Sequence, residues 1–266
     1  MQRYFAKDKK NNNIYLESTD LHHIKNVMRM NIGDSIECVY EGITYLCRID
    51  GYDNNISIIS KLDENNELDT EITIAIALVK EQKFDLILQK LTELGVSRII
   101  PLNMERSIIK LDSQKFEKKK KRWESICKEA SEQSHRNKIP EITNIMSLKE
   151  LVKLEVEDKY VCSVKEKENL VNKYLQNNSK CATMLYVIGP EGGITDKEED
   201  FLNNNGYTSI SLGPRVMRVE TAAIYIASIA NYCNMGWLYG VCYFSIVNCF
   251  SFLFLSLFMQ KKSKIV

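Results

Sequence analysis

From residue 71 onward, the sequence alternates short apolar runs with segments of helical periodicity. The run ITIAIAL at 72–78 is almost continuously apolar, which is typical of a strand that is buried on both faces. Apolar residues then recur at helical spacing from Phe84 to Leu91, and Gly95 follows as a stop. The same alternation predicts strands at 98–102, 160–164, 184–188 and 209–212, and helices at 114–132, after Ser147, at 196–204 and at 220–235. The pattern predicts an α/β layer fold with a mainly parallel sheet.

Three short runs of alternating or β-branched character precede this region. They are SIECV at 35–39, TYLCRI at 44–49 and ISIIS at 56–60. The polar segment ENNELD at 64–69 then breaks the pattern and is interpreted as a linker. We therefore expect a small β-domain over residues 1–68 and an α/β domain over residues 71–235.

The C-terminal region, residues 236–266, differs from the rest. The 22 residues from Trp237 to Phe258 carry no charge, and three lysines follow them. About 20 apolar residues are enough to cross a bilayer as a helix. Four interpretations remain open: a membrane anchor, an additional buried helix, an apolar surface for association, or an aberrant tail that replaced the native end. We favour the aberrant tail, so membrane contact is not the preferred interpretation.

The charge balance and the cysteines limit the class of protein. Lysine and arginine number 36, aspartate and glutamate 35, and the net charge of +1 argues against a generic polyanion-binding protein. The basic run at 115–122 fits either a solvated helix face or an edge that contacts phosphate. The eight cysteines form no CxxC pair and no zinc-type spacing with histidine. With no apolar leader at the start, these features predict a cytoplasmic protein with reduced thiols.

Two glycine-proline loops carry the clearest chemical signal. In the first, the apolar strand at 184–188 runs into Gly189, Pro190, Gly192 and Gly193, and a helix opens with the capping-box pair Thr195 and Glu198. Small residues at such a turn let a ligand approach the backbone. The spacing matches neither the Rossmann nor the P-loop pattern. The alternative is a βα turn that needs glycine for structural reasons alone.

The second loop repeats this arrangement at 211–228. A strand again ends in Gly213 and Pro214, and a helix begins near Glu220, with Arg215 and Arg218 between them. Ligands of parallel α/β sheets bind at the carboxyl ends of the strands. We therefore expect both loops to face one crevice.

The motifs GPEGG and LGPRVMRVETA together resemble the C-terminal signature of the SPOUT methyltransferases. More narrowly, they resemble the bacterial ribosomal RNA small subunit methyltransferase E family. Three other stretches agree with this family in order: HHIKNVMRMNIGDSIECV at 22–39, KFDLILQKLTELGVSRIIPLNMERS at 83–107 and RWESICKEASEQSHRNKIPEI at 122–142. The resemblance extends over about residues 1–232.

The resemblance implies an N-terminal PUA-like β-barrel domain and a SPOUT-type α/β methyltransferase domain with a deep trefoil knot. It implies a homodimer that binds S-adenosylmethionine and methylates N3 of one uridine in 16S rRNA or the small ribosomal subunit. The cofactor residues carried over from the family are Ile188, Gly189, Pro190, Glu191, Gly192, Gly193, Leu212, Gly213, Pro214, Val216 and Met217. Where the family usually has Arg-Thr-Glu-Thr, this chain has Arg218-Val219-Glu220-Thr221, which leaves one hydroxyl hydrogen bond in doubt.

Methylation at N3 of uridine requires loss of a weakly acidic proton and stabilisation of charge on O2 and O4. An arginine suits such an oxyanion, and a carboxylate can accept the proton. Arg218 and Glu220 are the first candidates, with Arg215 positioning phosphate or base; the alternative for Arg218 and Glu220 is a structural ion pair at a helix start. No metal is expected, because the sulfonium already supplies an activated methyl group.

RNA contacts are expected from scattered polar residues. Residues 1–33 hold six basic residues against three acids, and Gln133, Arg136 and Asn137 match a stretch of the family. The RNA-binding candidates are Arg3, Lys25, Arg29, Gln133, Arg136 and Asn137. Three other functions stay open: an rRNA-binding module without catalysis, a SPOUT methyltransferase that acts on another RNA, and a membrane protein whose soluble domain is incidental.

Overall fold

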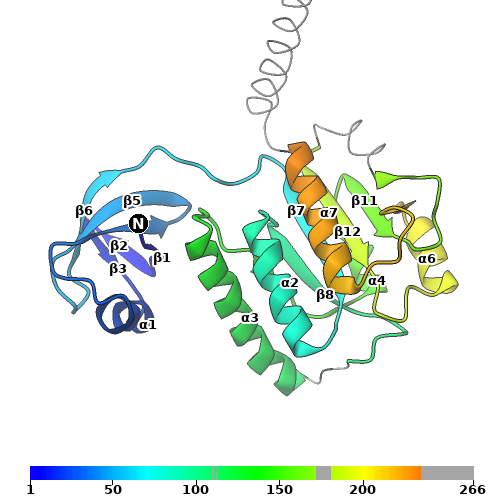
Figure 1. Ribbon diagram of the computed structural model, residues 1–266, viewed down its shortest axis with the longest axis horizontal. Helices are drawn as coiled ribbons and strands as arrows, with labels where there is room; N and C mark the ends of the chain where they lie inside the picture. Colours follow the sequence, from blue (N-terminus) through cyan, green and yellow to red (C-terminus); the bar gives the residue numbers. More distant parts are fainter. Residues whose placement is uncertain (110, 112, 172–180, 235–266) are drawn as a thin grey trace, which may run out of the picture.

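The computed structural model describes residues 1–109, 111, 113–171 and 181–234 (Figure 1). Within these residues the chain builds two separate β-sheets, one of six strands and one of seven. The first lies within residues 3–61 and the second within residues 71–210. Helices accompany both sheets, and the long helix α3 (Ser113–Gln133) reaches from the second sheet toward the first.

The first sheet has the strand order β1-β4-β5-β6-β3-β2, in which only the pair β1 and β4 is parallel. The strands predicted at 35–39, 44–49 and 56–60 are confirmed as β4, β5 and β6. Three strands of three residues each were not predicted, because such short runs show no period-2 alternation. The bounds are β1 Arg3–Phe5, β2 Asp8–Lys10, β3 Asn13–Tyr15, β4 Ser35–Tyr40, β5 Ile43–Ile49 and β6 Ile56–Lys61.

A hydrophobic core of its own stabilises this first sheet. Ile14, Ile36, Ile49 and Ile56 are almost completely buried in it. The short helix α1 (Ser18–His22) and the π-helical turn η1 (His23–Val27) follow β3, and Ile24 of η1 is buried in the same core. The sheet therefore encloses a core that does not depend on the second sheet.

All strand pairs of the second sheet are parallel, as the sequence predicts. The strand order is β10-β8-β7-β12-β11-β13, and β9 pairs with β8. The two-residue strands β9 and β10 were not predicted. The bounds are β7 Glu71–Ala77, β8 Arg98–Asn103, β9 Glu141–Ile142, β10 Met146–Ser147, β11 Asp158–Cys162, β12 Thr183–Ile188 and β13 Thr208–Ile210.

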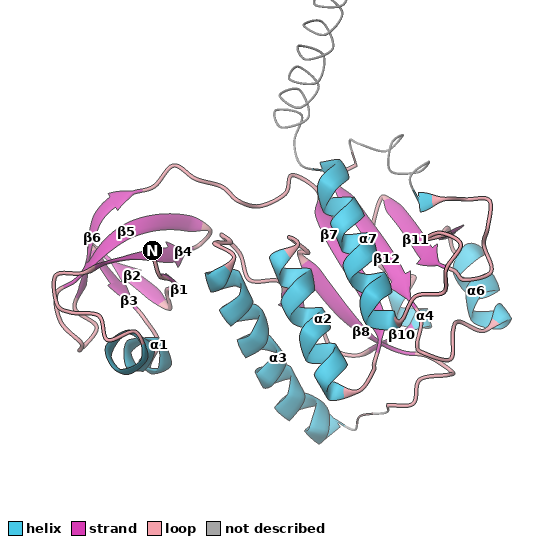
Figure 2. Cartoon of the chain, in the orientation of Figure 1, coloured by secondary structure: helices cyan, strands magenta, loops and turns pink. Residues whose placement is uncertain are grey.

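Helices cover both faces of this parallel sheet (Figure 2). Ile72, Ile74 and Ile76 of β7 point into one core, which also contains residues of α2 (Glu81–Glu93), α3 and α7 (Val219–Asn234). Ala75 and Ala77 point to the opposite core, with residues of α4 (Leu148–Leu151) and α6 (Asp196–Asn203). Because β7 is covered on both faces, it reads as a continuous apolar run. The predicted capping boxes at the starts of α4 and α6 are both present.

The order of the strands reverses direction in the middle of this sheet. From β7 the chain moves outward through β8 to β10, and it then crosses back to β11. Strand β12 lies between β7 and β11, and β13 adds next to β11. The carboxyl ends of four strands from distant parts of the sequence therefore meet at one place, where parallel α/β sheets bind ligands.

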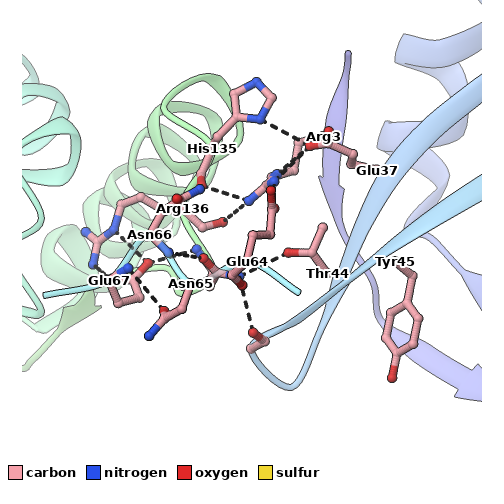
Figure 3. Close-up of polar contacts among 12 residues, drawn as sticks. Arg3, Glu37, Thr44, Tyr45, Glu64, Asn65, Asn66, Glu67, His135 and Arg136 are labelled. Carbon is pink, nitrogen blue, oxygen red and sulfur yellow. Dashed lines mark hydrogen bonds and ion pairs between the residues drawn. The ribbon is translucent and has the colours of Figure 1, made fainter. Parts of the chain in front are cut away.

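Arg3 joins the first sheet to the end of α3 (Figure 3). Its side chain is fully buried, and its Nε donates to Glu37 Oε2 at 2.9 Å. Its Nη1 donates to the carbonyl oxygens of His135 and Arg136 at 2.7 and 3.2 Å. The guanidinium also pairs with Glu64. One buried arginine therefore holds two carboxylates and two carbonyls from three segments.

Arg136 and Asn137 continue the same network on the other side. The Arg136 guanidinium pairs with Glu67 at 2.5 Å and donates to the carbonyl oxygens of Thr92 and Val96. The Asn137 amide donates to Thr44 Oγ1 at 3.0 Å. Both side chains belong to residues that are 3% exposed. The linker and the segment after α3 are thus bonded to β5 of the first sheet and to α2 with the loop that follows it.

This network corrects the assignment of Arg3, Arg136 and Asn137 as RNA contacts. Their donors are occupied by protein acceptors and their side chains are buried, so the folded protein does not present them to RNA. The basic balance of residues 1–33 gave the wrong prediction for Arg3, because a count of charges along a sequence does not reveal which cation is buried.

The uncharged segment Trp237–Phe258 and the whole of residues 236–266 lie outside the described residues. In the part of the chain that the structure describes, no helix is both long and apolar enough to cross a membrane.

We expect Arg3→Met to destabilise the protein by about 3–5 kcal/mol, because it leaves the partly buried carboxylates of Glu37 and Glu64 without their cation. The free energy of unfolding in urea measures this cost. Arg48→Met is the control, since Arg48 is 55% exposed and its pair with Asp50 should contribute less than about 1 kcal/mol. Equal effects of the two substitutions would show that the Arg3 network is not stabilising.

Glu132 makes the stability of this junction depend on pH. Burial raises the pKa of its carboxyl to about 7, against the opposing charge of Lys128. The folded protein therefore favours the protonated carboxyl of Glu132. The resulting contribution to the free energy of unfolding is complete below the unfolded pKa near 4.5, and it is lost as the pH rises through 7. Glu132→Gln should therefore raise the melting temperature relative to wild type by a few degrees at pH 8 and by less at pH 5. Glu124→Gln is the control for loss of one negative charge, because Glu124 is exposed on the same helix. The prediction is contradicted if Glu132→Gln changes the melting temperature equally at pH 5 and pH 8.

Candidate functional site

One pocket lies at the carboxyl edge of the parallel sheet. The loops that follow β11, β12 and β13 enclose it, together with the start of α7. Both glycine-proline loops therefore face one crevice, as the sequence predicts. Its walls are Cys162, Ser163, Val164, Lys165, Ile188, Gly189, Pro190, Gly193, Ile194, Glu199, Leu212, Gly213, Pro214, Arg215, Val216, Met217, Val219 and Ala222.

Nine of the eleven residues assigned to the cofactor line this pocket, and two do not. Glu191 points to helix α2 and forms an ion pair with Lys83. Gly192 lies against Arg106, whose Nη1 donates to the Gly192 carbonyl oxygen at 2.9 Å. Lys83 and Arg106 thus tie the first loop to the rest of the domain, a role for which the sequence held no signal.

The glycines of the two loops serve different purposes. Gly213 adopts a φ of 118°, and a Cβ there would meet no atom within 4 Å, so its backbone borders open space in the pocket. A Cβ at Gly189 would lie 2.5 Å from Cγ1 of Ile194. Gly189 is therefore required by the packing of its own loop, whereas Gly213 combines a left-handed backbone with access for a ligand.

The third wall of the pocket, residues 162–165, was not predicted as part of the site. The strand predicted at 160–164 overlaps this segment, but the segment carries no glycine, and only the sheet order shows that its end meets the two loops. Lys165 pairs with Asp196 and lies 4.0 Å from Glu199. Burial raises the pKa of the Cys162 thiol to about 12, so Cys162 contributes a neutral wall rather than a nucleophile.

The three candidate catalytic residues lie at the rim and beside it. Arg215 and Arg218 are exposed, and Arg215 lines the pocket. The Glu220 side chain is 14% exposed, and among the described residues its cationic partner is Lys83, at 3.8 Å, rather than Arg218. Lys83, with smaller effects of Lys80 and Arg218, holds the pKa of Glu191 below its usual range.

The Oε2 atom of Glu220 is buried and accepts no hydrogen bond from any described residue. A buried carboxylate oxygen of this kind is costly unless it is paired with another group. Glu220 is not itself a wall of the pocket, but it stands at the start of α7 directly after Val219, which is one.

The remaining RNA-binding candidates are exposed. Lys25 extends over the ring of Tyr52 with its Nζ 5.0 Å from the centroid. Arg29 follows the π-helical turn and adopts a φ of 51°, a conformation that is uncommon for a residue with a side chain. Gln133, at the end of α3, is also exposed. These three residues stay candidates for RNA contact.

Comparison with known proteins assigns the chain to a family. A family model described as an RNA methyltransferase domain matches residues 66–231, and one described as an RNA methyltransferase PUA domain matches residues 16–59. The ribosomal RNA small subunit methyltransferase E of Bacillus subtilis is 36% identical, over 87% of this chain and 96% of that protein. The chain belongs to the ribosomal RNA small subunit methyltransferase E family. The predicted resemblance and the PUA-like N-terminal domain are thereby confirmed.

Two solved structures share the fold of this methyltransferase E family member. A protein from Legionella pneumophila, assigned as a methyltransferase and crystallised with the cofactor SAM, superposes with a TM-score of 0.80 at 29% identity, covering 87% of this chain and 97% of that one. The ribosomal RNA small subunit methyltransferase E of Neisseria gonorrhoeae, bound to S-adenosyl methionine, has a TM-score of 0.77 at 28% identity, covering 86% and 96%.

Proposed function

We propose that this protein is an S-adenosylmethionine-dependent methyltransferase that methylates N3 of a specific uridine in 16S rRNA. The observation that carries the proposal is the convergence of two glycine-proline loops on one pocket at the carboxyl edge of the sheet. Membership of the methyltransferase E family, and the cofactor bound in the Legionella and Neisseria relatives, support it.

The pocket suits this cofactor. Ile188, Leu212 and Met217 supply apolar side chains for an adenine ring, and the backbone at Gly213 borders open space that a side chain would occupy. Lys165, with Asp196 and Glu199 beside it, supplies charged groups of both signs for an amino acid moiety. When bound, S-adenosylmethionine supplies an activated methyl group. The protein then has to bind the two substrates, orient them and accept one proton.

Three residues at or beside the rim of the pocket act on the uridine. The carboxylate of Glu220, which follows the pocket wall Val219 in the sequence, accepts the proton of uridine N3. The exposed guanidinium of Arg218 donates to the uracil oxygens as negative charge develops on O2 and O4. Arg215, on the pocket wall, positions the base or a phosphate.

The proposal includes the larger assembly that the family resemblance implies. Residues 1–68 hold RNA through Lys25 and Arg29, and Gln133 at the end of α3 adds a further contact. Residues 71–235 perform the transfer in the cytoplasm. The loops after β12 and β13 form a trefoil knot, and two copies form a homodimer. Tyr225 and Tyr232, 40% and 77% exposed on α7, are apolar surface that a partner copy would cover.

A non-catalytic rRNA-binding module and a methyltransferase for another RNA are the alternatives. The pocket formed by both glycine-proline loops favours a cofactor-binding enzyme over an RNA-binding module without a cofactor. The relatives' names favour small-subunit rRNA over other RNA.

We expect Ala222→Leu to weaken binding of S-adenosylmethionine by at least about tenfold, because the larger side chain enters the pocket from a helix without straining a loop. Calorimetry measures the dissociation constant. Thr221→Leu, exposed on the neighbouring position and outside the pocket walls, is the matched control. If Ala222→Leu keeps its melting temperature and binds the cofactor as wild type does, the cofactor lies elsewhere.

Mass spectrometry of 16S rRNA tests the reaction itself. Cells with the wild-type gene should contain an N3-methyluridine that cells without it lack. Arg218→Ala should lower turnover by roughly 10²–10³, because its charge acts chiefly in the transition state, and it should leave cofactor affinity unchanged. Identical rRNA with and without the gene contradicts the proposed function, whereas an equal loss in cofactor affinity reassigns Arg218 to binding.

A further inference from the structure

Lys83 connects the two halves of the candidate site. It stands in the first turn of α2, where its amide bonds to the Lys80 carbonyl, and its side chain is 32% exposed. Its ammonium group pairs with Glu191 on the first glycine-proline loop and lies 3.8 Å from Oε2 of Glu220 at the start of α7. One cation from α2 thus faces two carboxylates from two other elements.

The two carboxylates differ in what they bond. Glu191 accepts a hydrogen bond from the Lys83 ammonium, whereas Glu220 Oε2 is close enough for attraction but accepts no hydrogen bond among the described residues. The attraction of the ammonium therefore holds the buried carboxylate oxygen of Glu220 in place without using it in a hydrogen bond.

We propose that Lys83 is a positioning residue that fixes the first glycine-proline loop through Glu191 and orients Glu220 toward the substrate. The inference rests on the proposed function for the role of Glu220, and it adds a residue that neither glycine-proline motif contains. Lys83 does not touch the substrate; it acts through the two glutamates.

Removal of the cation has two separate physical consequences. Glu191 and Glu220 then repel each other without a counter-charge, which loosens the loop that carries Gly189 to Gly193. Glu220 also loses the attraction that orients it, and small misplacement of a catalytic group costs roughly 10–100-fold in rate.

The test compares Lys83→Met, Lys83→Arg and the double variant Lys83→Met/Glu191→Gln with wild type. Lys90→Met is the matched control, because Lys90 lies on the same helix and pairs locally with Glu93. Methyl transfer to 16S rRNA gives kcat and KM, and hydrogen exchange of residues 189–194 without cofactor reports on the loop.

Lys83→Met should lower kcat by roughly 10–100-fold with little change in the KM for rRNA, and it should speed exchange in the loop. Lys83→Arg should restore both, since it keeps the charge. The double variant should restore slow exchange but not kcat, because only the repulsion is relieved. Wild-type kcat and exchange in Lys83→Met, or failure of Lys83→Arg to restore either, would overturn the inference. If wild type itself shows no transfer, the proposed function fails, and the exchange measurement still decides whether Lys83 holds the loop.

Discussion

The parallel pairing of β12 between β7 and β11 is the constraint on which the rest of the site depends. These strands come from residues 71–77, 158–162 and 183–188, and their pairing brings their carboxyl ends to one edge. Everything at the site follows from that edge: the two glycine-proline loops, the segment 162–165 and the first turn of α2 that carries Lys83. Parallel strands require long connections, so such a convergence cannot arise from neighbours in the sequence.

The junction between the two sheets uses charge in a different way from the pocket. Around Arg3 and Arg136, cations are buried and every guanidinium nitrogen meets a carboxylate or a carbonyl, which fixes the geometry. At the pocket wall Arg215 is exposed, and so is Arg218 three residues later. Buried and fully paired cations stabilise the junction, whereas the exposed arginines beside the pocket are available to a ligand.

Sequence patterns predicted the α/β sheet and its helices well, because buried parallel strands and amphipathic helices carry strong periodic signals. The runs at 72–78 and 184–188 correspond to β7 and β12 within one residue at each end. Short strands such as β1, and contacts between distant residues, carry no such signal. The glycine and proline residues predicted two walls of the pocket. The wall at Cys162 and the position of Lys83 depend on the order of the strands, which the sequence does not indicate. Arg3 was interpreted as an RNA contact because its neighbours in the sequence give no sign that the fold buries its side chain.

The start of α7 shows how one short motif serves both packing and chemistry. Successive residues of a helix are about 100° apart, so neighbours face different surroundings. Val219 is 5% exposed and packs in the core while lining the pocket, Arg218 before it is exposed, and Glu220 after it is mostly buried beside Lys83. Valine at 219 supplies apolar contacts to the core and no hydroxyl. Packing therefore fixes Val219, and the charged groups of this turn are the candidates Arg218 and Glu220, of which the first is exposed and the second faces Lys83.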